Sequence, residues 1–122
     1  MTQSLKLTLK GQSFTATLNE NRTVDDILEM VPMGLTLQRY AGHEYYSSLP
    51  KKPSTKGVPM TSEAHAAGIY YYDGWSAFTV LFADAYIAPF EVVHIGDVNE
   101  EIITLLAESG DIVEVKIEAT EA

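Results

Sequence analysis

The residues with the clearest chemical potential are an adjacent histidine and glutamate, His43 and Glu44, with Tyr40 and Tyr46 close on either side. A carboxylate beside an imidazole can act as a general base, and phenol hydroxyl groups can orient a ligand by hydrogen bonds. The structural alternative is that Glu44 only anchors the loop that follows it. Strand alternation would also place His43 and Glu44 on opposite faces of a strand. We therefore count all four as candidate ligand-binding residues and assign no catalytic residue.

Aromatic side chains form a second group of candidates, concentrated around the dipeptide Asp73-Gly74. In a barrel, one alternating set of these side chains must fill the core, because aromatic side chains dominate core energetics. Core packing is the plain interpretation for four of them, Tyr70, Tyr72, Phe78 and Phe82. Trp75 stands beside the turn and is the best candidate for exposure, and an exposed aromatic patch usually marks a contact. Trp75 and the nearby Tyr72 therefore join the candidate ligand-binding residues.

Half of the lysines of the chain lie in one short segment, as Lys51, Lys52 and Lys56. Their ammonium groups can receive a carboxylate or a phosphate, and Lys51 is the candidate ligand-binding residue among them. The alternative is that these lysines only keep a surface loop solvated, which is the ordinary role of such charges.

The sequence contains no pattern that predicts a metal site or a cofactor. Its three histidines, His43, His65 and His94, are scattered, and no pair has the spacing that a site on one strand or helix requires. The chain has no cysteine, which excludes disulfides, thiol catalysis and thiolate metal ligands and suits a reducing compartment. A phosphate-binding glycine loop, a nucleophile elbow and a catalytic triad are also missing from the sequence. We expect no bound metal and no cofactor.

Length and charge limit the classes of protein to which the chain can belong. Its 122 residues suit a single domain, residues 1–122, with its own core. The net charge of −9 opposes binding to nucleic acids and to acidic membrane surfaces. The first residues lack the pattern of a signal peptide, and no apolar run is long enough to span a bilayer. We expect a cytoplasmic protein whose partner is a small organic ligand or a peptide.

Alternating apolar residues and turn signals predict about eight strands. The predicted strands cover residues 5–9, 14–18, 35–40, 44–48, 69–72, 75–83, 92–95 and 112–117. Two turns are assigned to Gly11-Gln12 and Asp73-Gly74, each of which is a good hairpin signal. Residues 49–59 contain three prolines and are predicted to form a long surface loop.

Two short helices are predicted from apolar residues at helical spacing and from capping residues. The first begins with Thr23 as its cap and ends before Pro32, because a proline excludes the residue before it from the helical region. The second begins with the capping pair Asp97 and Glu100. A further helical turn is expected over residues 62–66.

Many short strands with regular turn signals favour an antiparallel sandwich or a closed barrel. Two helices are too few to cover both faces of a parallel sheet. We predict a mostly β protein, a closed eight-stranded barrel with a short capping helix at each end. The alternative is a β-grasp fold, which also begins with a hairpin and a helix but leaves too many strands unused after residue 35.

Residues 35–57, LTLQRYAGHEYYSSLPKKPSTKG, are the most distinctive segment of the chain. They resemble a group of bacterial cyclophilin-like proteins, in which a strand ends in Tyr-Ala-Gly and is followed by a glutamate and by Leu-Pro with basic residues. The similarity continues through Gly68, Tyr71, Tyr72, Trp75 and Phe82 and covers nearly the whole chain. It implies a cyclophilin-like eight-stranded barrel with helices that cap its ends.

The resemblance does not imply prolyl isomerase activity. The Phe-His-Arg and Gly-Gly-Asp-Phe segments of true cyclophilins have no counterpart here, and the chain has only two arginines, Arg22 and Arg39. Gln38 and Arg39 also stand where members of the group commonly have acidic residues.

The sequence leaves three functional hypotheses. The first is a binding module for a small organic molecule or an extended peptide, with a pocket between residues 40–57 and the aromatic hairpin. The second is an enzyme that uses Glu44 or His43 as its general base. The third is a divergent peptidyl-prolyl isomerase.

Overall fold

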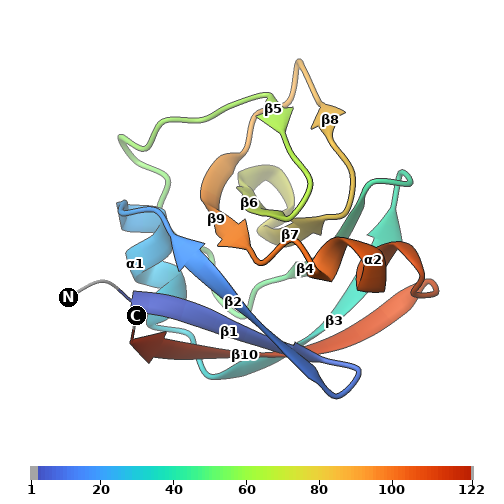
Figure 1. The fold of residues 1–122 in the computed structure, drawn as a ribbon. Helices are drawn as coiled ribbons and strands as arrows, with labels where there is room; N and C mark the ends of the chain where they lie inside the picture. The colour runs from blue at the N-terminus through green and yellow to red at the C-terminus, as the bar shows by residue number, and fades with distance from the viewer. Residues whose placement is uncertain (1–2, 122) are drawn as a thin grey trace.

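The chain forms a closed barrel of eight antiparallel strands, seen in a computed structural model that describes residues 3–121 (Figure 1). The barrel strands are β1 (Gln3–Leu9), β2 (Gln12–Leu18), β3 (Met33–Tyr40), β4 (Glu44–Ser48), β6 (Gly68–Tyr72), β7 (Ala77–Leu81), β9 (Val93–Val98) and β10 (Ile112–Glu121). Their order around the barrel is β1-β10-β3-β4-β7-β6-β9-β2. The predicted closed eight-stranded barrel is confirmed, and the β-grasp alternative is wrong.

The remaining elements lie outside the barrel wall. The helices α1 (Arg22–Leu28) and α2 (Ile102–Ala107) lie at two ends of the barrel (Figure 1). The strands β5 (Glu63–Ala64) and β8 (Ala85–Tyr86) form a separate two-stranded sheet, and the 3-10 helix η1 (Asp73–Trp75) connects β6 to β7. Within residues 3–121, no helix has the length and hydropathy needed to cross a membrane.

Alternation along the strands fills the barrel interior with apolar side chains. Leu5, Leu7 and Leu9 of β1 are buried, whereas the lysine and threonine between them are half-buried. The helices add further side chains to the same core, among them Ile27 of α1 and Leu106 of α2. The two short helices therefore close the ends of the barrel, as predicted.

Strand β6 is buried on both of its faces. Ile69 and Tyr71 belong to the barrel core, whereas Tyr70 belongs to a second, smaller core on the outer face of the barrel. The other buried members of this second core come from β5, β7 and the segment before β9, namely Ala64, Leu81 and Val92. The β5–β8 sheet therefore covers the outside of β6 and β7, and Figure 1 shows it on the side of the barrel away from β1 and β10.

Core packing, predicted for four aromatic residues, is confirmed for three of them and wrong for Tyr72. Phe78 and Phe82 pack in the barrel core. Tyr70 is also buried, but in the outer core, and Tyr72 is half-buried at the edge of that core. The reason is that strand alternation directs Tyr71, and not its two neighbours, into the barrel.

Two predicted turns differ from the observed ones. The first hairpin turns at Lys10 and Gly11, whose φ angles are 50° and 75°, and thus one residue earlier than predicted. Two positive φ angles are typical of a type I′ turn, which matches the twist of the strands on either side. The prediction of a two-residue turn at Asp73-Gly74 is wrong, because the 3-10 helix η1, followed by Ser76 in the left-handed conformation, connects β6 to β7.

The first helix has a different cap from the predicted one. Asn21, and not Thr23, caps α1, and its side-chain oxygen accepts a hydrogen bond of 2.8 Å from the Val24 N–H. The Thr23 hydroxyl instead donates to the carbonyl oxygen of Ser54, and the Asp26 carboxylate accepts from the Ser54 N–H, both at 2.7 Å. Helix α1 therefore anchors the long loop that the sequence predicted after β4.

The second helix begins later than predicted. It starts at Ile102, and the predicted capping pair does not form, because Asp97 lies on β9 and Glu100 precedes the helix. The side chain of Asp97 is engaged with two histidines instead. The helical turn predicted over residues 62–66 is also wrong, since this segment contains β5.

Two side chains from the barrel hold the carboxyl end of α2. The Tyr45 hydroxyl donates to the carbonyl oxygen of Gly110 at 2.6 Å, and the Arg39 guanidinium donates to that of Ser109 at 2.7 Å. The same guanidinium lies over the ring of Phe82, 4.5 Å from its centroid. The same donors also reach the last turn of α2, where the Leu106 carbonyl oxygen lies 3.2 Å from the Tyr45 hydroxyl and that of Ala107 lies 3.4 Å from the Arg39 guanidinium. Carbonyl groups at the end of a helix lack partners within the helix, and these donors supply them. Arg39 therefore has a structural role.

We expect Tyr45→Phe to destabilise the fold by about 1–2 kcal/mol, because it leaves carbonyl groups after α2 without their buried donor. Tyr46→Phe is the matched control, since the same hydroxyl is removed from the neighbouring residue of β4, whose side chain is only half-buried. Urea unfolding followed by circular dichroism measures both variants. Equal stability of Tyr45→Phe and the wild type would contradict this role.

Candidate functional site

A cleft of about 360 Å³, termed here the aromatic cleft, opens on the outer face of the barrel. Its floor consists of the β7 residues that alternate with the core residues of that strand, Ala77, Thr79 and Leu81. Its walls come from the end of β3, the start of β4 and the turn between them, from β5, β6 and η1, and from the segment after β8. The aromatic and ionisable side chains of these walls are Tyr40, His43, Glu44, Tyr70, Tyr72, Trp75 and Phe90. The segment around Glu44 and the aromatic turn are therefore neighbours, as predicted.

Trp75 is the centre of the aromatic wall. Its ring centroid lies 5.8 Å from that of Tyr40, 5.7 Å from that of Tyr46 and 5.6 Å from that of Tyr72. Despite these contacts, Trp75 is 51% exposed and Tyr40 is 46% exposed. The exposure predicted for Trp75 is confirmed, and its physical reason is η1, which keeps the indole out of the β7 alternation.

His43 and Glu44 form the polar end of the cleft. His43 lies in the turn between β3 and β4, where Ala41 and Gly42 have positive φ angles of 57° and 75°. The prediction that the two side chains occupy opposite faces is wrong, because alternation applies to a strand and His43 precedes it. His43 Nε2 lies 3.0 Å from Glu44 Oε1, and the two side chains are only 20% and 16% exposed.

Both ring nitrogens of His43 lie close to an oxygen atom. Nδ1 lies 3.3 Å from the carbonyl oxygen of Ala41, and Nε2 lies 3.0 Å from Glu44 Oε1. The contact between Nε2 and Glu44 needs one proton between the two groups, on the imidazole or on the carboxyl group. Burial raises the pKa of Glu44 above its usual value, although the charge of His43 and its hydrogen bond lower it. The pair therefore has one group that can release a proton and one that can accept it, and these are the roles of a general acid and a general base.

Two of the predicted candidate residues do not line the cleft. Tyr46 packs edge-on against Tyr40, with 5.8 Å between the ring centroids, and supports the aromatic wall. Lys51 is exposed in the long loop and is not among the lining residues. The structure brings together the other five predicted candidates, Tyr40, His43, Glu44, Tyr72 and Trp75.

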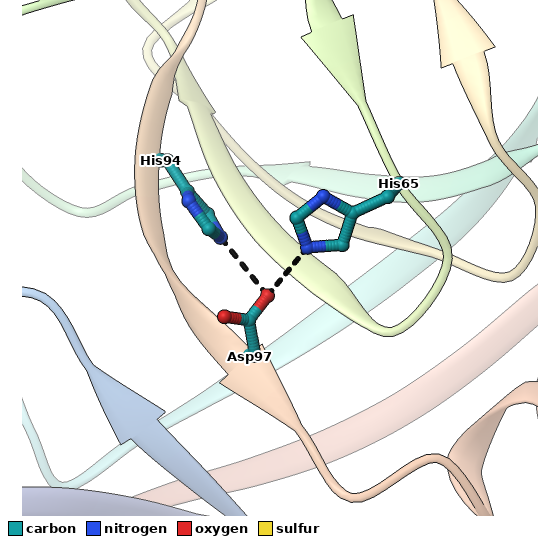
Figure 2. Close-up of side chains that lie close together, drawn as sticks. All are labelled: His65, His94 and Asp97. Carbon is teal, nitrogen blue, oxygen red and sulfur yellow. Dashed lines mark hydrogen bonds and ion pairs between the residues drawn. The ribbon is translucent and has the colours of Figure 1, made fainter.

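A second polar group, His65, His94 and Asp97, lies beside the aromatic cleft (Figure 2). Asp97 Oδ1 lies 2.7 Å from His65 Nε2 and 3.0 Å from His94 Nε2. One potential ligand atom from each residue lies within 4.8 Å of the other two. The two histidines line an open cleft of about 710 Å³, which shares Ala64 and Tyr70 with the aromatic cleft. Imidazole nitrogens and a carboxylate oxygen are donors that a divalent metal ion can use.

A β-bulge in β9 brings His94 and Asp97 to the same face of the strand. Consecutive residues of β6 pair with Gly96 and His94, so Ile95 is an extra residue in β9. Residues three apart on a regular strand point to opposite faces, and one extra residue reverses this relation. A Cβ atom at Gly96 would overlap the backbone oxygen of Thr17, so only glycine fits beside the bulge.

The sequence analysis missed this cluster because it considered spacing within one strand or one helix. His65 lies in the loop between β5 and β6, and it reaches Asp97 only because β6 and β9 are neighbours in the barrel. The one local signal for the cluster was that His94 and Asp97 are three residues apart. On a regular strand this spacing places two side chains on opposite faces, and only the bulge brings them to the same face. The prediction of no metal site was based on spacing within one strand or helix. The observed cluster combines residues from two segments, so that argument does not apply to it.

Tyr70 holds both histidines of the cluster in place. Its hydroxyl accepts a hydrogen bond of 3.1 Å from the backbone N–H of His65 and lies 3.0 Å from Nδ1 of the same residue. Its ring stacks on the ring of His94, with 4.8 Å between the centroids. Burial raises the pKa of the Tyr70 hydroxyl, which keeps it protonated. Burial also raises the pKa of Asp97, but the hydrogen bonds from His65 and His94 and their charge outweigh this effect and lower it overall.

Comparisons with known proteins agree with the fold. A family model described as the cyclophilin-like family matches residues 7–118. Among solved structures, the chain is similar to the solution structure of a hypothetical protein from Archaeoglobus fulgidus, with 18% sequence identity and a TM-score of 0.67. That match covers 96% of this chain and 94% of the archaeal one. No curated protein matches the chain. At this identity, the structural likeness shows the fold alone.

We expect the free energy of unfolding of Glu44→Gln to rise relative to that of the wild type as the pH increases from about 4 to about 7. Burial holds the pKa of Glu44 above its usual 4.5, so the folded state binds this proton more tightly than the unfolded state does. The resulting stabilisation is fully present below 4.5 and is lost as the pH rises through the raised pKa. Urea unfolding at several pH values measures the difference.

Glu114→Gln is the control for this experiment, because it removes one negative charge from an exposed position on β10. A difference between Glu44→Gln and the wild type that stays constant with pH, or that shrinks as the pH rises, would contradict the assigned burial effect.

Proposed function

The chain belongs to the cyclophilin-like family, and we propose that it is a binding module whose aromatic cleft holds a small organic cation. The observation that carries the proposal is the wall of aromatic rings that ends at the largely buried carboxylate of Glu44. The rings supply apolar contact area, and the carboxylate, when ionised, supplies a negative charge.

The aromatic wall supports binding of an organic molecule. Trp75 and Tyr40 are about half exposed, and Phe90 is 57% exposed. Aromatic surface gathered in this way usually marks a contact with another molecule. The faces of tryptophan and tyrosine rings attract cations through their quadrupole. The apolar floor at Ala77 and Leu81 suits the hydrocarbon part of the same ligand.

The charges around the cleft support a cation over an anion. The Glu44 carboxylate can accept a charge-assisted hydrogen bond from an ammonium group. Among the residues that the structure describes, no lysine or arginine lines this cleft, and His43 is the one lining side chain that can become positively charged. The net charge of −9 also favours the approach of cations to the protein.

The dimensions of the cleft support a small molecule over an extended peptide. Its volume of about 360 Å³ lies near the lower end of the usual range for small-molecule sites. An extended peptide commonly binds by pairing with the free edge of a sheet. Each of the eight barrel strands is already paired on both sides, so the barrel offers no such edge.

We expect benzylamine to bind more tightly than its neutral analogue, benzyl alcohol, and Glu44→Gln to weaken benzylamine binding by about tenfold or more. The loss of one charge-assisted hydrogen bond accounts for this difference. Trp75→Ala should weaken the binding of both compounds, because the indole contacts the shared ring. Titration calorimetry and the rise of Tm with ligand concentration measure these effects.

Tyr86→Ala is the matched control for Trp75→Ala, since Tyr86 is 74% exposed and lies outside the aromatic cleft. This variant should bind both compounds as the wild type does. Equal affinity of the wild type for benzylamine and benzyl alcohol would exclude a cation site. Failure of both compounds to bind would count against the cleft as a site for aromatic ligands.

An enzyme is the second candidate, and the 3.0 Å contact between His43 Nε2 and Glu44 Oε1 favours it, because it places two groups that can transfer protons at one end of the cleft. The two candidates differ in the fate of the ligand. A binding module returns its ligand unchanged after prolonged incubation, whereas an enzyme yields a product that nuclear magnetic resonance detects. For an enzyme, Glu44→Gln would reduce turnover more strongly than affinity.

A further inference from the structure

We propose that His65, His94 and Asp97 form a binding site for a divalent transition-metal ion of the zinc class (Figure 2). The three side chains point toward one another from β9 and from the loop between β5 and β6. This site goes beyond the proposed cation-binding function, because its ligands are different residues in a different cleft.

The distances within the cluster suit coordination of one ion. Zinc lies about 2.0–2.2 Å from imidazole nitrogen and carboxylate oxygen ligands, so the ligand atoms of a tetrahedral site are about 3.4 Å apart. The Asp97 oxygen lies 2.7 Å and 3.0 Å from the two imidazole nitrogens, and all three atoms lie within 4.8 Å of one another. The side chains of His65 and Asp97 are about half exposed, so rotating them can open the Asp97 contacts toward coordination distances. His94 is 29% exposed and stacks on Tyr70, and its Nε2 also lies 3.1 Å from the carbonyl oxygen of Gly96, a contact that an ion would replace.

The ligand types favour zinc and its neighbours over magnesium or calcium. Two imidazole nitrogens and one carboxylate oxygen are a common ligand set for divalent transition metals, whereas magnesium and calcium prefer oxygen ligands alone. Three protein ligands also leave at least one coordination position free. The two histidines line the open cleft of about 710 Å³, and Glu63 and Asp84 line it too and add negative charge.

Tyr70 supplies the outer contact that metal-binding histidines commonly have. A histidine that binds a metal through Nε2 keeps its proton on Nδ1 and donates it to a neighbouring acceptor. His65 Nδ1 lies 3.0 Å from the Tyr70 hydroxyl, whose oxygen can accept that proton. Tyr70 is 1% exposed, and the backbone N–H of His65 fixes its hydroxyl, so the acceptor is held in place before an ion arrives.

The structural alternative is that the three side chains only tie the loop before β6 to β9. In that case their hydrogen bonds contribute to stability, and no metal ion binds with a defined stoichiometry. The chain offers a clean test, because it has only three histidines and no cysteine. His43 lies outside the cluster and is the matched control for both histidine ligands.

The test is calorimetric titration of the full chain with zinc chloride after dialysis against a chelator. We expect the wild type to bind one zinc ion per chain. His65→Ala, His94→Ala and Asp97→Asn should each weaken binding at least about tenfold, and His43→Ala should leave it unchanged. Substitution with Co²⁺ should give the visible absorption of a coordinated ion in the wild type and in His43→Ala alone.

Circular dichroism establishes whether each variant is folded. If a histidine variant fails to fold, Asp97→Asn still tests the site, because this substitution keeps the size of the side chain. Failure of the wild type to bind zinc at about 100 μM, far above the dissociation constants of built zinc sites, would overturn the proposal. Equal loss in His43→Ala and His65→Ala, or equal affinity for Mg²⁺ and Zn²⁺, would also overturn it. The benzylamine experiment depends on Glu44 and Trp75, so either proposal can fail without the other.

Discussion

The burial of β6 on both of its faces is the constraint on which the rest of the structure depends. Alternation directs Ile69 and Tyr71 into the barrel and places Tyr70 and Tyr72 outside it. Removing an aromatic side chain such as Tyr70 from water is strongly favourable, and this requires a cover on the outer surface. Residues 59–66 and 83–92 provide that cover as the β5–β8 sheet and its flanking segments. The barrel wall therefore separates two cores.

Both candidate sites lie where the outer core opens to solvent. The aromatic cleft opens between β7 and the segment after β8, and the histidine cluster lies beside it, on β9 and in the loop before β6. Tyr70 lines both clefts, stacks on His94 and positions His65, so it links the packing of the outer core to the geometry of the cluster. The bulge at Ile95 is the second requirement, because it aligns His94 with Asp97.

The strands with one buried face could be predicted from the sequence, as Leu5, Leu7 and Leu9 show. Strand β6 has apolar residues on both faces. Its sequence therefore lacks the alternation of apolar and polar residues that would indicate which of Tyr70 and Tyr71 enters the barrel. Proximity of Glu44 and Trp75 followed from the predicted barrel, whereas their geometry depends on η1 and on the turn before β4. The histidine cluster depends on long-range strand pairing and a bulge, which no local pattern indicates.

The orientation of β6 is tested most directly by nuclear Overhauser contacts from the rings of its tyrosines. The structure predicts contacts from the Tyr70 ring to methyl groups of Leu81 and Val92, in the outer core, and from the Tyr71 ring to barrel-core methyl groups such as those of Val80. The opposite assignment, with the Tyr70 ring against Val80, would contradict the account. It would place the outer core, the aromatic cleft and the histidine cluster on the wrong side of the barrel wall.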